Sequence, residues 1–249
     1  MNRFGAFGIH LGISLLIFTI LGYLILFHWY PDFFFTSDGG WQGIRIVAFV
    51  DLVLGPTLTL VVFNPAKPAK ELRRDLSIIG VFQLACLTAG TYVVYSERPI
   101  AMVYSDGTFT SMTVDDYLEV GQPLPDLKQF PDGPPVWVSV HLPEDPGEQS
   151  RIRESAIEQR KPLRTYAEYY EAFQPDDIDP MLDGLPYAQL RARDAKTPFI
   201  SDFLKSHTGT LEDYIFLPFG TRYRLALLAK RRESDELIYL AIPLDTQAS

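Results

Sequence analysis

Three long apolar runs occupy the first part of the chain. Residues 9–30 and 76–96 contain no Asp, Glu, Lys or Arg, and residues 46–63 are apolar except for Asp51 and a Gly-Pro pair. A helix rises about 1.5 Å per residue, so about 20 residues cross the hydrocarbon core of a bilayer. The pattern therefore predicts three transmembrane helices, at about 9–30, 45–63 and 76–96.

The first run has an alternative interpretation as a cleaved signal peptide. Such peptides have an apolar core of roughly 7–15 residues, followed by small residues at the cleavage site. Here the run is longer and leads into the bulky sequence Phe-His-Trp-Tyr-Pro at residues 27–31. The pattern favours a retained helix.

Beyond residue 97 the apolar positions form short runs separated by turns. Two of these runs flank Asp106-Gly107, a pair typical of a two-residue hairpin turn. We expect strands at 100–104, 108–113, 136–141, 214–218, 223–230 and 237–243, and helices at 114–120, 148–159, 163–173, 187–195 and 200–206. The predicted fold is a three-helix transmembrane anchor (1–96) followed by an α+β domain (97–249) with a mostly antiparallel sheet.

Charge divides the chain at the same place. Residues 1–95 carry 6 Lys/Arg and 5 Asp/Glu, whereas residues 96–249 carry 16 and 26. The whole-chain values, a net charge of −9 and a mean hydropathy of +0.04, therefore describe neither part. The acidic balance argues against general nucleic-acid binding, and the single cysteine, Cys86, argues against a disulfide framework.

Basic residues are concentrated in one of the two short connectors between the runs. Residues 64–75 hold four Lys or Arg, whereas residues 31–44 hold none. The positive-inside rule then predicts that 64–75 and the N-terminus are cytoplasmic. Residues 97–249 would lie on the other side, which is the periplasm for a bacterial inner-membrane protein.

Among the residues of the three runs, Asp51 costs the most free energy to place inside a membrane. Gly55 and Thr59 follow at four-residue spacing, so the three share one helix face, and Pro56 should interrupt the helical hydrogen bonding. Two interpretations stay open: an acid satisfied within the helix bundle, and a contact with a partner helix. On the predicted topology, His28 and either Thr91 or Tyr92 lie at similar depth, and we expect them as the partners of Asp51.

Local sequence motifs for catalysis or metal binding are missing. The acidic segment 174–184 does not have the spacing of a calcium loop, and His141 and His207 have no ligand-type neighbours at suitable spacing. Residues 230–232 look like a charged hairpin tip. We expect no enzyme activity, no cofactor, no metal and no small-molecule substrate.

The second run leads into the most specific stretch of the sequence. It reads D-L-V-L-G-P-T-L-T-L-V-V-F-N-P-A-K from Asp51 to Lys67, followed by E-L-R-R-D-L from Glu71. This stretch resembles the signature of the type IV pilin accessory proteins (TfpX/TfpZ type). The positions that carry the resemblance are Asp51, Gly55, Pro56, Thr59, Asn64, Pro65, Lys67, Arg73 and Asp75.

The resemblance implies a non-enzymatic, chaperone-like inner-membrane protein that assists the stability, assembly or surface display of a type IV pilin, its expected partner. Before assembly such a pilin crosses the membrane with one apolar helix and has a folded head in the periplasm. Our hypothesis is that Gly55 and Pro56 open a docking groove while residues 96–249 contact the head. The alternatives are a membrane-anchored periplasmic sensor or ligand-binding module, and a membrane-tethered enzyme.

Overall fold

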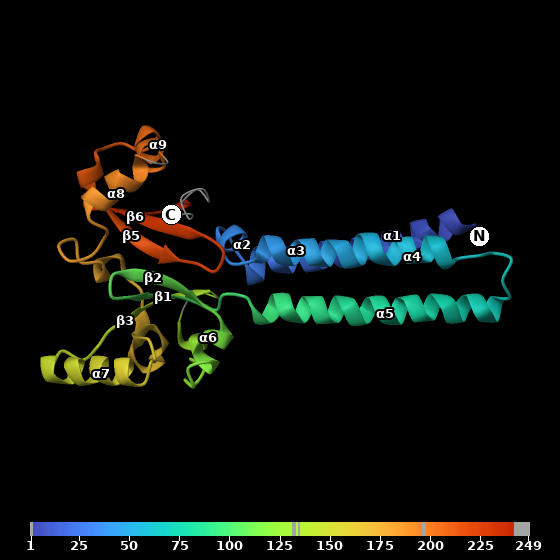
Figure 1. The fold of residues 1–249 in the computed structure, drawn as a ribbon, viewed down its shortest axis with the longest axis horizontal. Coiled ribbons are helices and arrows are strands. Elements are labelled where there is room, and N and C mark those ends of the chain that lie inside the picture. Colours follow the sequence, from blue (N-terminus) through green and yellow to red (C-terminus); the bar gives the residue numbers. More distant parts are fainter. Residues whose placement is uncertain (1, 131–132, 134, 196–197, 242–249) are drawn as a thin grey trace. The chain divides into compact units, whose positions relative to one another are not determined.

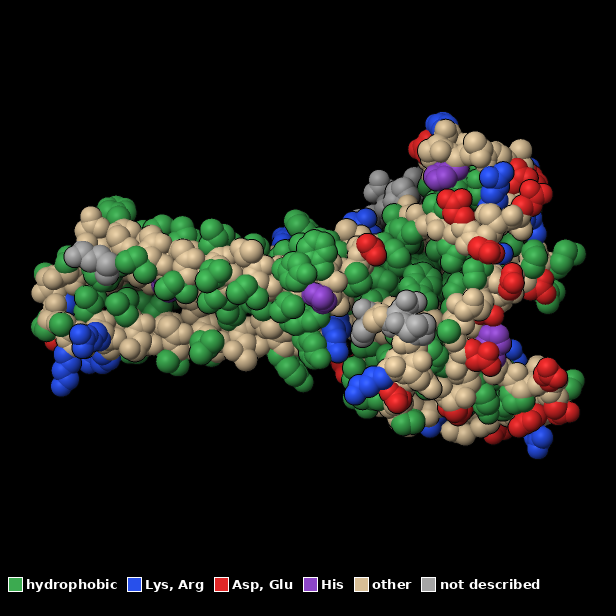
Figure 2. All heavy atoms as spheres, turned by 180° about the vertical axis from the view of Figure 1, so that it is seen from behind, with side chains coloured by type: hydrophobic (Ala, Val, Ile, Leu, Met, Phe, Trp, Pro, Cys, Tyr) green, Lys and Arg blue, Asp and Glu red, His purple; other side chains and the backbone are tan. Residues whose placement is uncertain are grey.

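The computed structural model describes residues 2–130, 133, 135–195 and 198–241. The chain divides into two compact units (Figure 1). Met1–Arg98 form what we call the helical unit, and Pro99–Ser249 form the sheet unit. On the face that Figure 2 shows, hydrophobic side chains are spread along the helical unit, whereas Asp and Glu gather on the sheet unit. The division agrees with the change in charge along the sequence.

The helical unit consists of three long helices and one short one. Each long helix is long and apolar enough to cross a membrane. The first contains α1 (Arg3–Leu24) and the π-helical turn η1 (Ile25–Trp29), the second contains α3 (Gly40–Ala48), η2 (Phe49–Leu54, also π-helical) and α4 (Gly55–Val62), and the third is α5 (Ala69–Ser96). The short helix α2 (Phe34–Ser37) lies in the first connector.

All three long helices begin earlier than the apolar runs predict. The second begins at Gly40, after Gly39 with a φ of +112°, and the third begins at Ala69. A run without charges marks the part of a helix that suits the hydrocarbon core, but helical hydrogen bonding continues into polar flanking residues. The earlier start places Asp51 near the middle of its helix.

The second long helix packs against both of the others, through contacts of α4 with α1 and of α3 and α4 with α5. Small residues permit this close packing, because a Cβ added at Gly43 would lie 2.9 Å from the methyl groups of Val94. The hydroxyl of Tyr30 donates to the backbone carbonyl of Val94 at 2.8 Å and so joins the end of the first helix to α5.

The sheet unit contains one seven-stranded sheet with the order β4-β3-β1-β2-β5-β6-β7. The pairs β1–β3 and β2–β5 are parallel and the other four are antiparallel, so the predicted α+β fold is confirmed with a mixed sheet. The strands are β1 (Ala101–Ser105), β2 (Thr108–Met112), β3 (Val136–Val140), β4 (Tyr170–Ala172), β5 (Tyr214–Gly220), β6 (Leu225–Arg231) and β7 (Leu237–Ala241).

Four α-helices and several short 3₁₀ turns complete the described part of the sheet unit. The α-helices are α6 (Val114–Leu118), α7 (Pro146–Glu158), α8 (Tyr187–Asp194) and α9 (Ile200–Ser206). The 3₁₀ turns are η3 (Leu127–Gln129), η4 (Leu163–Thr165), η5 (Ala167–Tyr169), η6 (Pro175–Asp177) and η7 (Leu211–Asp213).

The predicted helix at 163–173 is wrong, because two 3₁₀ turns and strand β4 occupy this segment. Tyr170 pairs with Val140 of β3 and its side chain is buried in the core. Tertiary pairing therefore overrides local helical propensity here. The β1–β2 hairpin is confirmed, with positive φ at both Asp106 (49°) and Gly107 (71°), as a type I′ turn requires. Positions 242 and 243 of the last predicted strand lie outside the described residues.

Two of the apolar clusters in the described core of the sheet unit pack helices against its strands. One joins α6 to the central strands through Tyr117, Val103 and Val138. The other packs α8 and α9 on β5 and β6, with Phe203 against Phe216. These clusters hold the connecting loops at the sheet edges in place.

Candidate functional site

Five polar side chains from the three long helices meet inside the helical unit. They are His10 and Ser14 from α1, Asp51 from η2, Thr59 from α4 and Gln83 from α5, and we call them the polar cluster. Ser14, Asp51, Thr59 and Gln83 are buried, and His10 is half-buried. Polar groups in such surroundings require hydrogen-bond partners.

Gln83 is the centre of the polar cluster. Its Nε2 donates to Asp51 Oδ1 at 2.6 Å and to Ser14 Oγ at 3.3 Å, while its Oε1 lies 2.6 Å from His10 Nε2. An amide oxygen only accepts, so His10 Nε2 carries the proton in this contact. His10 Nδ1 lies 2.5 Å from Thr59 Oγ1. One glutamine therefore links all three long helices.

Asp51 is satisfied within the bundle through only one of its oxygens. The side chain has no exposed surface, and its Oδ2 has no hydrogen-bond partner among the described residues. Asp51 therefore lies inside the bundle and bonds Gln83 instead of His28, Thr91 or Tyr92, while a contact of its Oδ2 with a partner helix stays a prediction. The helix starts earlier than predicted, so Asp51 lies opposite Gln83 instead of near the far end of α5.

Gly55 and Pro56 lie inside the helical unit. A Cβ added at Gly55 would lie 2.0 Å from Gln83 Oε1, so the glycine makes room for the amide. The Gly55 N–H bonds to Val50 O five residues earlier, so the helix is π-helical just before Pro56. Both residues are buried. The hypothesis that they open a docking groove is therefore wrong.

The remaining residues of the signature lie in or next to the connector between α4 and α5, and most of them make contacts within it. Asn64 Oδ1 accepts a hydrogen bond from Ala66 N, next to Pro65, and Lys67 Nζ forms a 2.6 Å ion pair with Asp75. Arg73 is exposed on the first turns of α5. The signature therefore divides into an inner part at the polar cluster and an outer part that shapes the basic connector.

Sequence reasoning missed three members of the polar cluster: His10, Ser14 and Gln83. A usable signal was present, because His10 and Ser14 are polar residues at four-residue spacing in an otherwise apolar run. Gln83 is an amide within the third uncharged run. Intramembrane polar residues usually face other helices, and this rule would have pointed all three toward Asp51.

An open apolar groove lies between α1 and α5, with a volume of about 510 Å³. Apolar and aromatic side chains form its walls, together with the hydroxyl-bearing Thr88 and Thr91. The lining residues are Ile17, Ile20, Leu21, Trp29, Leu87, Thr88, Thr91, Tyr92 and Tyr95. The groove is therefore an open, almost entirely apolar depression in the surface of the helical unit.

Serine, histidine and aspartate meet once in the described part of the sheet unit. Ser139 Oγ donates to Asp177 Oδ2 at 2.6 Å, and His141 Nε2 lies 2.9 Å from the same Oγ. His141 Nε2 also lies 3.2 Å from Asp177 Oδ1, so the three side chains contact one another. Among the described residues, no group of three or more His, Cys, Asp or Glu is arranged to hold a metal ion.

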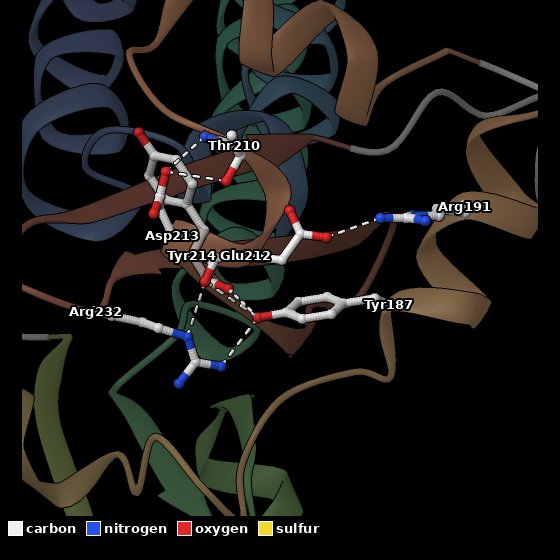
Figure 3. Close-up of polar contacts among 7 residues, drawn as sticks. All are labelled: Tyr187, Arg191, Thr210, Glu212, Asp213, Tyr214 and Arg232. Atoms are coloured by element: carbon white, nitrogen blue, oxygen red, sulfur yellow. Dashed lines mark hydrogen bonds and ion pairs between the residues drawn. The ribbon is translucent and has the colours of Figure 1, made fainter.

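Arg232 connects three segments of the sheet unit. Its guanidinium donates to the backbone carbonyl of Glu212 (3.1 Å) and to the hydroxyl of Tyr187 (3.0 Å), as Figure 3 shows. It also donates to the backbone carbonyl of Pro180 (2.7 Å). The predicted charged hairpin between β6 and β7 is confirmed, with Arg232 in its turn, but Lys230 is a buried residue of β6 and Arg232 is a structural donor.

Two buried tyrosines of the sheet unit act as neutral hydrogen-bonding groups. Burial raises the pKa of Tyr117 to about 12, and its hydroxyl lies 2.8 Å from that of Tyr170. Burial and the adjacent Asp183 carboxylate raise the pKa of Tyr104 well above its ordinary value. These side chains therefore stay protonated near neutral pH and brace the structure.

The fold defines a protein with two kinds of surface, an apolar helical one suited to membrane association and an acidic water-soluble one. Residues 1–33 match the family of the fimbrial assembly protein FimB. The chain is also 35% identical over 126 residues to the fimbrial assembly protein of Dichelobacter nodosus serogroup I, and 34% identical over 126 residues to that of serogroup E1. No solved structure matches this chain.

A shorter relative establishes the family. The fimbrial assembly protein of D. nodosus serogroups C1 and C2 is 33% identical over 111 residues, which cover 45% of this chain and 85% of that protein. The chain belongs to the fimbrial assembly protein family. For the serogroup I and E1 proteins, the matched region covers 50% of this chain and 49% of each relative, so this chain spans about half their length.

Proposed function

We propose that this protein is a multi-pass inner-membrane accessory protein of the TfpX/TfpZ type. It holds a type IV pilin before assembly and so supports the stability, assembly or surface display of that pilin. It acts by binding, without catalysis and without a cofactor. The observation that carries the proposal is the open apolar groove between α1 and α5, in a chain of the fimbrial assembly protein family.

The groove suits an apolar helix better than a water-soluble ligand. Helices in a membrane associate through close packing and interhelical hydrogen bonds, because lipid tails already satisfy apolar surface. The groove offers concave walls for packing, and Thr88 and Thr91 add hydroxyl groups between them. The apolar helix by which a pilin is held before assembly suits the apolar walls of this groove.

Filling the groove should weaken pilin capture. Thr88→Trp places a large side chain in the groove, and we expect at least about tenfold less pilin to co-purify in detergent, a change worth about 1.4 kcal/mol. Ile78→Trp is the matched control, because Ile78 is 61% exposed on the same helix outside the groove. Equal capture by both variants would contradict the groove as the site, and normal pilin level and surface display in a deletion strain would contradict the function.

The proposed orientation has its own test. A reporter active only in the periplasm should be active when fused after residue 110 and inactive when fused at residue 69. The reason is that the 64–75 connector carries four basic residues and the 31–44 connector none. The opposite pair of activities would reverse the proposed topology.

A further inference from the structure

Two adjacent apolar side chains protrude from the acidic segment that precedes α8. Met181 is 87% exposed and Leu182 is 83% exposed, the highest values among the exposed large hydrophobic residues described. Single exposed apolar residues are common on protein surfaces, but an adjacent pair at this exposure is not explained by the core. We call residues 178–185 the apolar loop.

The apolar loop is held in one conformation by its own backbone and carboxylates. Asp179 Oδ1 accepts from Met181 N at 2.7 Å and from Leu182 N at 3.3 Å, while Asp183 Oδ2 accepts from Asp179 N at 2.7 Å. Gly184 closes the loop with a φ of +98°. The two protruding side chains therefore stand on an ordered base.

Two hydrogen bonds and one buried side chain fix this base to the rest of the sheet unit. The Tyr104 hydroxyl donates to Asp183 Oδ2 at 2.6 Å, Arg232 donates to Pro180 O at 2.7 Å, and Ile178 is 1% exposed. A preorganised loop loses little conformational entropy when a partner covers it. Met181 and Leu182 are therefore preorganised for binding to a partner.

The charge around Met181 and Leu182 limits which kind of partner can bind there. Four carboxylates lie within or next to the apolar loop: Asp176, Asp177, Asp179 and Asp183. A second copy would bring an equally acidic sheet unit against them, and an anionic lipid surface would repel them. The complementary surface is an apolar pocket bordered by Lys or Arg on another protein.

We infer that the apolar loop binds such a pocket on the water-soluble head of the pilin, with Met181 and Leu182 inserted and the carboxylates facing basic residues. The inference rests on the proposed function. It adds a second contact, separate from the groove: the groove takes the membrane helix of the pilin, and the apolar loop takes its head.

The test measures binding of the full-length chain in detergent to the full-length major pilin of the same bacterium. The double variant Met181→Ser/Leu182→Ser should bind at least tenfold more weakly, with an unchanged melting temperature. Ile157→Ser, at a residue 78% exposed on α7, is the matched control and should change affinity less than twofold. A photo-cross-linking amino acid at position 182, but not at position 157, should form an adduct with the pilin.

Several results would overturn the inference. Unchanged affinity of the double variant would do so, and so would adducts from position 182 only with lipid or with a second copy of the chain. If the wild-type chain captures no pilin at all, both the proposed function and this inference fail. If Thr88→Trp weakens capture and the double variant does not, only the apolar loop is excluded as a contact.

Discussion

Gly55→Ala should lower the free energy of unfolding of the helical unit by about 3 kcal/mol, the largest effect we expect from a single methyl group in this chain. The added Cβ would lie 2.0 Å from Oε1 and 2.4 Å from the Cδ of Gln83. A flexible side chain can move away from such a contact, but here movement breaks the hydrogen bonds that Gln83 makes with His10 and Asp51. The clash therefore cannot be relieved without loss elsewhere.

Thermal or denaturant unfolding in detergent, followed by circular dichroism, measures this effect. Gly80→Ala is the matched control, because Gly80 lies in α5 and a Cβ there has nothing within 4 Å. In a Gln83→Ala background the Gly55→Ala change should cost less than about 1 kcal/mol, since contacting residues are not additive. Equal effects at Gly55 and Gly80, or full additivity with Gln83→Ala, would contradict the packing account.

The sequence was sufficient where local chemistry decides the structure. Uninterrupted apolar runs identified the three long helices, and Asp106-Gly107 identified the β1–β2 hairpin, because a type I′ turn requires two positive φ angles. The spacing of Asp51, Gly55 and Thr59 also placed them correctly on one face. Each of these features depends on neighbours within a few residues.

The sequence was insufficient where distant segments decide the structure. Strand β4 follows two 3₁₀ turns because Tyr170 pairs with Val140, 30 positions earlier in the chain, and local propensity cannot show this. The partner of Asp51 was missed for a similar reason. The depth of Asp51 in the membrane was inferred from the ends of the charge-free runs. Because the helices begin before those runs, the residues that lie opposite each other on neighbouring helices differ from those predicted.

Gln83→Leu should be the second most damaging substitution in the helical unit. Interhelical hydrogen bonds inside membranes are worth about 0.6 kcal/mol each on average. Gln83 makes three such contacts, with His10, Ser14 and Asp51. Leucine has a similar volume but no polar atoms, so we expect a loss of about 2 kcal/mol from the missing contacts and the buried groups that they leave unpaired.

Asp51→Asn separates hydrogen bonding from charge in the same experiment. Asparagine keeps an acceptor oxygen for Gln83 Nε2, and the position of Oδ2 has no partner to lose among the described residues. The unfolding free energy should therefore change by less than about 1 kcal/mol, well below the effect of Gln83→Leu. If Asp51→Asn is the more damaging of the two, the negative charge itself holds the helices together. If Gln83→Leu unfolds like the wild type, the hydrogen bonds of the polar cluster contribute nothing to stability.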